Sequence, residues 1–402
     1  MDKISILKNP VQAYDWGSRT EIQKIIGDRG SSGKSMAELW MGAHPKAPSQ
    51  VMIKENWLTL DKAIEEDPES ILGKRVAERF SNKLPFLFKV LASEKPLSLQ
   101  VHPNRKQAQE GFHRENRMAI PLDGANRNYK DCNHKPEILC ALTPFIGLMG
   151  FRPVEDILAL FDMLTPSSTL SDKLNPLIKR PDSHGLMSFF SSLMEDEKPQ
   201  QQKIAGEAAR YAEKYTDQDQ AFFWVKELNR YYPGDIGILS PIILNLVRLE
   251  PKEAVYIPAG EPHAYLHGLG IELMANSDNV LRGGLTPKHI DIKEFLSIID
   301  FHPRPARKVD TVKTSICRTI YKTPAKEFEV SVISIDKNNP FTSATDRNVE
   351  IIICLEGTAD IIDVENGEAL AVFHGMSFIV PSVVTQYRIE GDAVLYMAYV
   401  PD

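Results

Sequence analysis

E-P-K-E-A-V-Y-I-P-A-G-E-P-H-A-Y-L-H-G-L-G-I-E-L-M-A-N-S-D-N-V-L-R-G-G-L-T-P-K-H-I, residues 250–290 of this chain, is the stretch that decides the fold. Its run Ala254–Ile257 is rich in residues that favour strands, Pro258-Ala259-Gly260 predicts a turn, and Gly270–Met274 predicts a second strand. The remaining side chains bring imidazole, phenol, carboxylate and cationic groups: His263, Tyr265, Glu272, Asp278, Arg282 and Lys288. A stretch this polar is unsuited to a core hairpin and too well bounded for a random loop.

The second half of the stretch predicts how these polar groups are presented. His263 and Tyr265 are two residues apart, so an extended backbone places them on one face. Residues 276–279 predict a tight polar turn, and Arg282-Gly283-Gly284 predicts a flexible basic corner whose glycines let the backbone approach another group closely. A helix is expected over Thr286–Ile299, with Thr286 as its N-cap and Pro287 at the first helical position.

Length and composition bound the classes of protein to consider. The 402 residues suggest two or three domains, and 43% hydrophobic with 25% charged residues is typical of a globular protein. A net charge of -7 argues against a nucleic-acid-binding face, although a local cluster of cations could still bind a small anion. We expect no signal peptide and no membrane span. The four cysteines show no paired spacing and predict free thiols in a reducing cytoplasm: Cys132, Cys140, Cys317 and Cys354.

The pattern of apolar residues changes along the chain. The first part alternates short apolar runs with turn residues and reads mostly as β, with helices expected over Leu60–Glu66 and near Asn82. Helical spacing begins at Val154 and is replaced by strand patterns after Tyr232. Many short strands with turn signals predict a sandwich or jelly roll. The predicted divisions are a first β part (1–150), a helical insert (151–235), a second β part (236–308) and a C-terminal β domain (309–402).

A faint internal repeat links the central stretch to the C-terminal part. Val255-Tyr256-Ile257-Pro258 is echoed by residues 377–381, S-F-I-V-P, and five residues after each proline stand His263 and Gln386 respectively. The C-terminal part is therefore interpreted as a second copy that lacks the histidine. The alternative is coincidence, because a strand followed by proline, a loop and another strand is a common pattern.

Two further motifs carry side chains suited to binding a metal ion. In residues 96–104, P-L-S-L-Q-V-H-P-N, alternation places Ser98, Gln100 and His102 on one face, which either lines a polar cavity or simply faces water. In N-H-K-P-E, Glu137 opens an apolar strand, where burial is costly without a partner. With His263, the imidazole of His102 and this carboxylate form a plausible ligand set for zinc or non-haem iron. Other histidines compete for this role: His44, His113, His267 and His289.

Aromatic residues beside glycine and acids form a third feature. Trp16 lies in Y-D-W-G, and Trp40 lies in A-E-L-W-M-G-A-H-P. Such residues can wall a sugar pocket, but they are more often core anchors with a polar handle. We interpret Trp40 as a core residue and leave both interpretations open for Trp16.

Taken together, these motifs resemble one known family. Y-D-W-G, A-E-L-W-M-G-A-H-P, P-F-L-F-K-V-L, P-L-S-L-Q-V-H-P-N, N-H-K-P-E, E-P-H-A-Y-L and S-D-N-V-L-R-G-G-L-T-P-K occur in order between Tyr14 and Lys288. In combination they closely resemble the type I phosphomannose isomerases. The resemblance implies a cupin-type catalytic domain, a helical domain, and a C-terminal β domain that is a second, degenerate cupin. This chain has Gly-Gly after Arg282, where many relatives have Ala-Gly.

The resemblance also implies an activity and its residues. The expected enzyme is a cytoplasmic aldose-ketose isomerase of carbohydrate metabolism that interconverts mannose 6-phosphate and fructose 6-phosphate. It implies one zinc ion per chain, bound by Gln100, His102, Glu137 and His263. Gln100 enters only through the resemblance, because amides are uncommon zinc ligands. Arg282 is implied to be catalytic, and the implied pocket-lining residues are Ser98, Lys89, Lys135, Tyr265, Glu272, Asp278 and Lys288.

The chemistry of this reaction assigns provisional roles. Isomerisation moves a proton between C2 and C1 through an enediol, which needs a general base and a stabilised oxyanion. Candidate bases are Glu272, Lys135 and His134. We favour Glu272, because Arg282 and Lys135 could hold it ionised, although a structural ion pair is the alternative. Arg282 could bind phosphate or steady the enediolate, and Lys288 at a helix start suits a phosphate.

Two other functions compete with the isomerase. An iron-dependent cupin oxygenase could use the same histidines and glutamate, although no H-x-D/E pair is present. A non-catalytic cupin could bind a sugar phosphate without exchanging its proton. We expect a monomer whose partner is a small sugar phosphate. The direction of the reaction, towards glycolysis or towards GDP-mannose, stays open.

Overall fold

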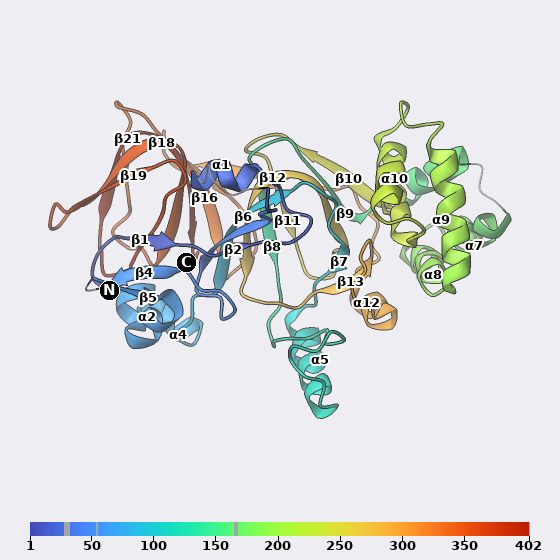
Figure 1. The fold of residues 1–402 in the computed structure, drawn as a ribbon, viewed down its shortest axis with the longest axis horizontal. Coiled ribbons are helices and arrows are strands. Elements are labelled where there is room, and N and C mark those ends of the chain that lie inside the picture. The colour runs from blue at the N-terminus through green and yellow to red at the C-terminus, as the bar shows by residue number, and fades with distance from the viewer. Residues whose placement is uncertain (28–32, 54, 165–167, 402) are drawn as a thin grey trace.

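A computed structural model describes residues 1–27, 33–53, 55–164 and 168–401. Positions 165–167 of the predicted helical insert and the final residue of the predicted C-terminal domain, Asp402, lie outside these ranges. Figure 1 shows two curled β bodies side by side, with a group of helices next to the central body, on the side away from the other body. The chain is mostly β, as expected, and its strands pair in antiparallel fashion.

The central body is a ten-stranded sheet organised around β12. β12 pairs with β6, β7, β8 and β9, so its residues face four neighbouring strands. The predicted strand Ala254–Ile257 is confirmed as β11, and the strand predicted over Gly270–Met274 is the second half of the longer β12. The strands are β2 (Val11–Gln12), β3 (Glu38–Gly42), β6 (Phe86–Ser93), β7 (Leu99–Val101), β8 (Glu137–Ala141), β9 (Phe145–Phe151), β10 (Leu244–Leu249), β11 (Ala254–Ile257), β12 (His263–Ala275) and β13 (Leu281–Gly284).

The second body is an eleven-stranded sheet built from both ends of the chain. β1 pairs with β20 on one side and β4 on the other, so the N-terminal strands join the C-terminal ones. The sequence did not predict this pairing. The strands are β1 (Ser5–Lys8), β4 (Gln50–Ile53), β5 (Asn56–Thr59), β14 (Thr311–Lys313), β15 (Arg318–Tyr321), β16 (Glu329–Ile335), β17 (Phe341–Thr342), β18 (Glu350–Asp363), β19 (Ala369–Phe373), β20 (Ser377–Val380) and β21 (Tyr387–Tyr399).

The helices lie in the connections between strands. The predicted helix Leu60–Glu66 is confirmed as α2, and α6 to α11 lie between β9 and β10, two strands that pair with each other. This run of helices therefore leaves the central sheet and returns to its edge (Figure 1). The bounds are α1 (Glu21–Ile26), α2 (Leu60–Glu66), α3 (Pro68–Leu72), α4 (Lys74–Arg79), α5 (Arg105–Arg117), α6 (Val154–Met163), α7 (Ser168–Lys179), α8 (Ser183–Met194), α9 (Lys198–Ala212), α10 (Gln220–Tyr231), η1 (Ile236–Leu239), α11 (Ser240–Ile243) and α12 (Ile292–Ile298).

Shared apolar cores join these parts. One core packs helix residues such as Phe189 against Leu148 and Phe151 of the central sheet. A second core contains Ile138 of the central sheet together with Ile351 of the other sheet. Burial of apolar surface on both sides therefore fixes the central sheet against its neighbours.

Three local predictions are wrong. The helix expected from Thr286 begins only at Ile292, because Asp291 is the N-cap and accepts from the Glu294 amide at 3.1 Å. The Thr286 hydroxyl instead closes a turn by accepting from the amide of Lys288 at 3.1 Å. The predicted corner Arg282-Gly283-Gly284 belongs to β13. Near Asn82 there is a left-handed turn, three residues after α4 ends.

Within the described ranges, the helices lack the combination of length and apolar composition that crossing a membrane requires.

Candidate active site

The register of three strands places the first group of polar residues in one row. Gln100 on β7 lies opposite His263 of β12 and, on its other side, opposite Arg282 of β13. Directly opposed residues in antiparallel strands share a face of the sheet. The close approach of β13 depends on Gly283, because a Cβ there would lie 2.2 Å from Cζ of Phe295. The glycine signal in the sequence therefore reflects helix-to-strand packing.

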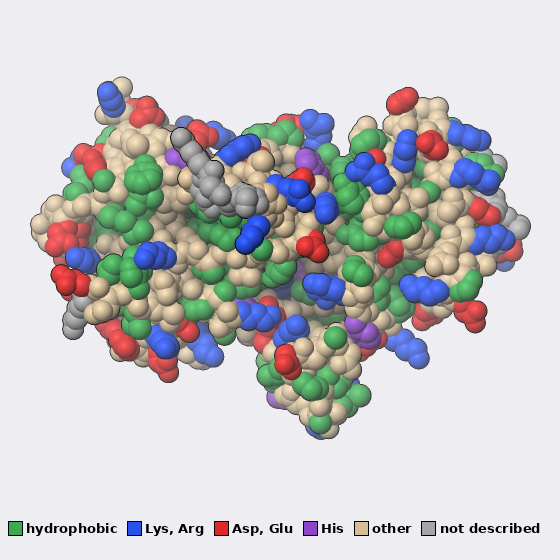
Figure 2. Space-filling view, in the orientation of Figure 1, with side chains coloured by type: hydrophobic (Ala, Val, Ile, Leu, Met, Phe, Trp, Pro, Cys, Tyr) green, Lys and Arg blue, Asp and Glu red, His purple; other side chains and the backbone are tan. Residues whose placement is uncertain are grey.

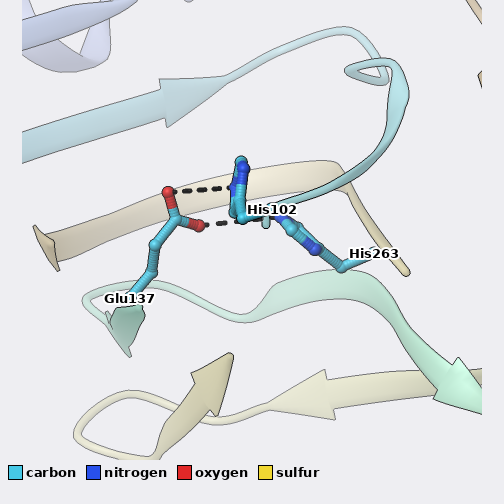
Figure 3. Close-up of side chains that lie close together, drawn as sticks. All are labelled: His102, Glu137 and His263. Atoms are coloured by element: carbon cyan, nitrogen blue, oxygen red, sulfur yellow. Dashed lines mark ion pairs between the residues drawn. The ribbon is translucent and has the colours of Figure 1, made fainter. Parts of the chain in front are cut away.

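Three buried side chains converge next to this row (Figure 3). Nε2 of His102 lies 3.4 Å from Oε1 of Glu137, and Nε2 of His263 lies 3.6 Å from Oε2 of the same carboxylate. The ligand atoms all lie within 4.8 Å of one another, and each of the three residues is buried. His102 directly follows β7, Glu137 opens β8 and His263 opens β12, so residues far apart in the sequence meet at one point.

Backbone carbonyl groups bind Nδ1 of both imidazole rings and leave Nε2 of each ring free. Nδ1 of His102 lies 2.9 Å from the carbonyl oxygen of Asn279, and Nδ1 of His263 lies 2.8 Å from that of Glu261. A carbonyl only accepts hydrogen bonds, so each Nδ1 donates and each Nε2 keeps its lone pair. Such contacts fix the orientation of a metal-binding imidazole.

Burial and nearby charges favour the protonation states in which the two histidines and the glutamate bind a metal ion. Burial lowers the pKa of His102 and lowers that of His263 to about 4, so both rings are neutral. Burial raises the pKa of Glu137, but attraction to the ammonium group of Lys135 outweighs it and holds this pKa well below its usual range. Nζ of Lys135 lies 3.1 Å from Oε1 of Glu137. Neutral imidazole and ionised carboxylate are the forms that coordinate a metal ion.

The donor set passes a test of fit for a metal ion. Nε2 of His102 and Oε2 of Glu137 are buried without a hydrogen-bond partner. Buried polar atoms are normally satisfied, and unsatisfied ones call for an explanation such as a bound ion. Two imidazoles and a carboxylate suit zinc or non-haem iron.

Gln100 lies against this cluster, where the family resemblance places it. Its Nε2 is 3.1 Å from Nε2 of His263. The oxygen and nitrogen of an amide occupy equivalent positions after a half-turn of the side chain. The same position therefore allows the Gln100 oxygen to face a metal ion.

A buried ion network lies beside the cluster. Nζ of Lys89 is 2.8 Å from Oε2 of Glu272 and 3.4 Å from Oε1 of Glu38. The hydroxyl of Tyr265 donates to Oε1 of Glu272 at 3.0 Å. Burial opposes the charge of Lys89, but Glu272 and Glu38 raise its pKa above the usual value, while burial raises the pKa of Glu272 itself. Lys89 is therefore the ion-pair partner of Glu272, a place we expected Arg282 and Lys135 to take.

Four cationic side chains lie close enough to one another beside Gln100 to affect each other's pKa. Burial lowers the pKa of Arg282, and burial together with repulsion from neighbouring cations lowers those of Lys130 and Lys288. Asp278 is the carboxylate among them, and its Oδ2 lies 2.9 Å from Nζ of Lys46. Figure 2 shows Lys and Arg side chains gathered over the central body. We call Lys46, Lys130, Arg282 and Lys288 the cation cluster.

Aromatic side chains border the same region. Trp16 stacks on Tyr14 with ring centroids 5.6 Å apart and packs against the core cluster that contains Tyr265. Nζ of Lys288 lies 6.0 Å from the centroid of the Tyr14 ring. Ser98 lies just before β7 and is half-buried. Trp40 is buried, as expected, and its indole donates to Glu38 at 2.8 Å.

Some contributing residues were missed from the sequence. Lys46 and Lys130 stand one residue after A-H-P and three residues before N-H-K-P-E, but an isolated lysine carries little signal. Asn279 was noticed only as a turn residue. Its carbonyl holds His102, and its side-chain amide donates to the backbone of Asp131 at 2.9 Å and of Asn133 at 2.9 Å. Motif spacing carries no information about such long-range contacts.

The competing histidines lie elsewhere. His44 is buried and lies 3.6 Å from Asp278, and burial lowers its pKa to about 4. His113 and His267 are exposed on α5 and β12. Nε2 of His134 forms a hydrogen bond with Oε1 of Glu327 at 2.8 Å. Within the described chain, the histidine, cysteine and carboxylate groups placed to share one metal ion are His102, Glu137 and His263.

Comparison with known proteins identifies relatives that all belong to one enzyme family. The model of the catalytic domain of type I phosphomannose isomerase matches residues 4–154. Mannose-6-phosphate isomerase of Escherichia coli (strain K12) is 38% identical over 98% of this chain and 98% of its own length. The Rattus norvegicus mannose-6-phosphate isomerase is 35% identical over 92% of this chain and 91% of its own.

Solved structures agree with the sequence comparisons. A zinc-bound holo form of mannose 6-phosphate isomerase superposes with a TM-score of 0.91 at 36% identity, covering all of both chains. A mutant of phosphomannose isomerase from Salmonella typhimurium gives the same TM-score, identity and coverage. The resemblance therefore extends over the whole chain, including the parts outside the quoted motifs.

Proposed function

This chain belongs to the mannose-6-phosphate isomerase family, and from that premise we propose that it interconverts mannose 6-phosphate and fructose 6-phosphate with one bound zinc ion. The observation that carries the proposal is the convergence of His102, Glu137 and His263, with two buried atoms lacking partners, beside a cluster of cations. A metal-binding set next to an anion-binding set matches a substrate that has hydroxyl groups at one end and a phosphate at the other.

His102, Glu137 and His263 would hold the zinc ion, with Gln100 as the fourth protein ligand. When bound, zinc supplies a Lewis acid that stabilises negative charge on substrate oxygens. A neutral amide leaves more positive charge on the metal than a second carboxylate would. The matching holo structure of mannose 6-phosphate isomerase is zinc-bound, which supports this choice over iron.

The substrate phosphate would lie on the cation cluster. Asp278 and Asp123 lie near these four cations, and burial together with repulsion among the cations lowers the pKa of Lys130 and Lys288. A bound dianion would relieve this repulsion, and charge-assisted hydrogen bonds to phosphate are strong. Trp16 and Ser98 would border the sugar. Arg282 lies opposite Gln100 and therefore also faces the reacting end, where it would stabilise the developing oxyanion.

For the proton transfer we favour Glu272 as general base and Lys135 as its acid partner. Glu272 is buried with a raised pKa, which brings its basicity closer to neutral pH. Tyr265 and Lys89 orient its carboxylate. The third candidate, His134, has its ring nitrogen bound to Glu327. The proton would pass between C2 and C1 through an enediol.

The finer organisation is likewise a proposal. We propose that residues 1–150 and 236–308 form a catalytic cupin domain, that 151–235 is a helical insert, and that 309–402 is a degenerate second cupin. Both β11–β12 and β20–β21 join a four-residue strand to a thirteen-residue strand through a loop that begins with proline. Gln386 stands just before β21, where His263 opens β12. The second copy would therefore lack the metal ligand.

We further infer a monomeric cytoplasmic enzyme. All four cysteines are free, and three of them are buried. Free cysteines are common in proteins of reducing compartments. Sedimentation of the purified protein at several concentrations should give a single species at the mass of one chain. A species of twice that mass would refute the monomer.

Isotope exchange tests the proposed reaction. In deuterated water, an enediol mechanism should place solvent deuterium on the carbon that receives the proton. Glu272→Gln should slow this incorporation about 100-fold or more, since general bases typically contribute 10²–10⁴. Exchange at the normal rate in Glu272→Gln would refute the assignment of the base. Binding of sugar phosphate without any exchange in the native protein would refute the isomerase.

Replacement of a ligand tests the metal site. His102→Ala should remove both bound zinc and activity, because it deletes one of three buried ligands. His113→Ala, the same change at an exposed histidine of α5, is the matched control and should alter neither. A His102→Ala protein that is active and metal-free would contradict the proposal.

A further inference from the structure

A carboxylate from the C-terminal part of the chain reaches towards the metal centre from outside the central sheet. Glu327 lies between β15 and β16, and its side chain is 8% exposed. Its Oε1 accepts from Nη2 of Arg105 at 3.0 Å and from Nε2 of His134 at 2.8 Å. Nη2 of Arg105 also lies 3.2 Å from Nε2 of His134, so each of the three groups contacts the other two. We call this set of three side chains the Glu327 clamp.

Each of the two residues that Glu327 contacts is three residues away in sequence from a proposed metal ligand. Arg105 follows His102 by three residues, and His134 precedes Glu137 by three residues. The clamp therefore joins the two chain segments that deliver two of the three converging ligands. Arg105 is the first residue of α5, which follows the end of β7 at Val101, and His134 lies in the irregular segment just before β8 begins at Glu137.

Apolar packing is incomplete where the clamp lies. A cavity of about 440 Å³ borders Arg105, His134 and Glu327, and its walls also include Phe80 and Tyr256. Side chains beside such a space lack the close contacts that fix residues in a packed core. The ionic contact with Glu327 therefore restrains the position of His134 on this side.

Glu327 is itself held firmly against the central sheet. Its neighbours Ala325 and Phe328 are buried in the core that also contains Ile138 of β8. The hydroxyl of Tyr321, at the end of β15, donates to the carbonyl of Lys252 at 2.8 Å. Burial raises the pKa of Glu327, but its hydrogen bond and attraction to His134 and Arg105 lower it overall, so the carboxylate is ionised.

We propose that Glu327 is a positioning residue for the metal centre. Through Arg105 and His134 it fixes the spacing of the segments that carry His102 and Glu137, and it so couples the C-terminal sheet to zinc affinity. The proposal rests on the proposed zinc-dependent function. It assigns to the C-terminal part a role in the site although the converging ligands all come from the central sheet.

Zinc affinity is the direct test. Zinc dissociation constants would be measured by competition with a chelator for the native protein, Glu327→Gln and Glu327→Ala. Partners that orient metal ligands typically contribute 10–100-fold to affinity. Because Glu327 acts through the backbone, we expect about a tenfold loss for Glu327→Ala. We expect a smaller loss for Glu327→Gln, whose amide oxygen still accepts both hydrogen bonds.

Glu329 provides the matched control. It is buried two residues further along and pairs with Lys322 at 2.8 Å and with Tyr399, all within the second sheet. Glu329→Gln should therefore keep native zinc affinity. The unfolding temperature of each metal-free variant would show that all of them fold.

The outcomes separate the clamp from the proposed function. Native affinity in both Glu327 variants would overturn the clamp, and so would an equal loss in Glu329→Gln, since that would reflect a general weakening of the second sheet. Isomerase activity of the native protein is measured separately. Zinc binding without isomerisation would refute the proposed function, while the order of affinities would still decide the role of Glu327.

Discussion

At the scale of single residues, burial and hydrogen bonding determine which groups are charged. Lys89 is protonated between two carboxylates, while His102 and His263 are neutral because burial lowers their pKa. Their Nδ1 atoms are occupied by backbone carbonyls, so Nε2 is the only atom that each ring offers. Fixed neutral imidazoles next to an ionised carboxylate bind a metal ion without first losing protons.

Lys130 tests the anion-binding role of the cation cluster. A charge-assisted hydrogen bond contributes about 1.5–3 kcal/mol, so Lys130→Ala should raise KM for mannose 6-phosphate about tenfold or more with little change in kcat. Steady-state kinetics measures both constants. Lys106→Ala is the control, because Lys106 is 84% exposed on α5. An unchanged KM in Lys130→Ala would remove Lys130 from the phosphate site.

His44 predicts a dependence of stability on pH. Its Nδ1 accepts from the amide of Lys46 at 3.3 Å, so protonation there would set two donors against each other, and burial lowers its pKa to about 4. As pH falls, the unfolded chain takes up this proton near pH 6.5, before the folded chain does. Stability should therefore be lost between pH 6.5 and 4, by at most about 3 kcal/mol from this group.

Urea unfolding of the metal-free protein measures the contribution of His44. His44→Asn removes the titrating ring, so its stability should fall less steeply over this pH window. The buried histidines of the metal site titrate in the same direction in both proteins, so only the difference between the two pH profiles reports on His44. Parallel profiles would contradict the assignment.

The residue types of the site could be predicted from the sequence, but their partners could not. Alternation in P-L-S-L-Q-V-H-P-N predicted that Gln100 and His102 share one face, and the position of Glu137 at the start of an apolar strand indicated a carboxylate whose burial is costly without a partner. The pairing of Lys89 with Glu272 depends on the register between β6 and β12, which lie 183 residues apart at this point. A single sequence carries no signal for such a register.

At the scale of elements, β12 and β13 determine where the site is formed. The thirteen residues of β12 run from His263 to Ala275, and it contacts the strands that carry Gln100, Glu137 and Lys89. The sequence predicted Gly270–Met274 as a strand and placed His263 and Tyr265 in an extended segment, without joining the two into one strand. Gly270 is packed closely against β8, since a Cβ there would lie 3.0 Å from the carbonyl oxygen of Cys140.

Gly283 tests the packing of β13. In Gly283→Ala the new Cβ would overlap the ring of Phe295, so β13 must shift and carry Arg282 away from its place opposite Gln100. We expect a loss of about 1–3 kcal/mol in unfolding free energy, the range typical of overpacking, together with lower activity. Urea unfolding and steady-state kinetics measure these effects.

Gly206 of α9 offers the same substitution without a clash. It is exposed, and among the described residues no atom outside its own turn of helix lies within 4 Å of the position of its Cβ. Gly206→Ala should therefore stabilise the protein by about 0.5–1 kcal/mol, the helix preference for alanine. Similar effects of the two substitutions would contradict the packing account of β13.

At the scale of the whole molecule, the N- and C-terminal parts of the chain are interleaved. β1 lies between β20 and β4, and the core that contains Ile138 also contains Ile351. Composition changes along the sequence predicted the order of β and helical parts, because hydrophobic periodicity is local. The pairing of β1 with β20 was not predicted, since its partners are separated by almost the whole chain.

Shared cores predict cooperative unfolding. Because the central sheet shares a core with the helices and another with the second sheet, we expect one main calorimetric transition. Zinc at 100 times its dissociation constant should raise stability by about 2.7 kcal/mol. Two transitions, of which zinc shifts only one, would show that the central sheet unfolds independently.

One measurement tests the central claim most directly: isomerisation of mannose 6-phosphate before and after chelation, with the metal content determined on the same samples. We predict one zinc ion per chain in the active protein, loss of activity in step with loss of zinc, and recovery when zinc is added back. A folded, zinc-loaded protein without isomerase activity would contradict the account, and so would full activity after complete removal of the metal.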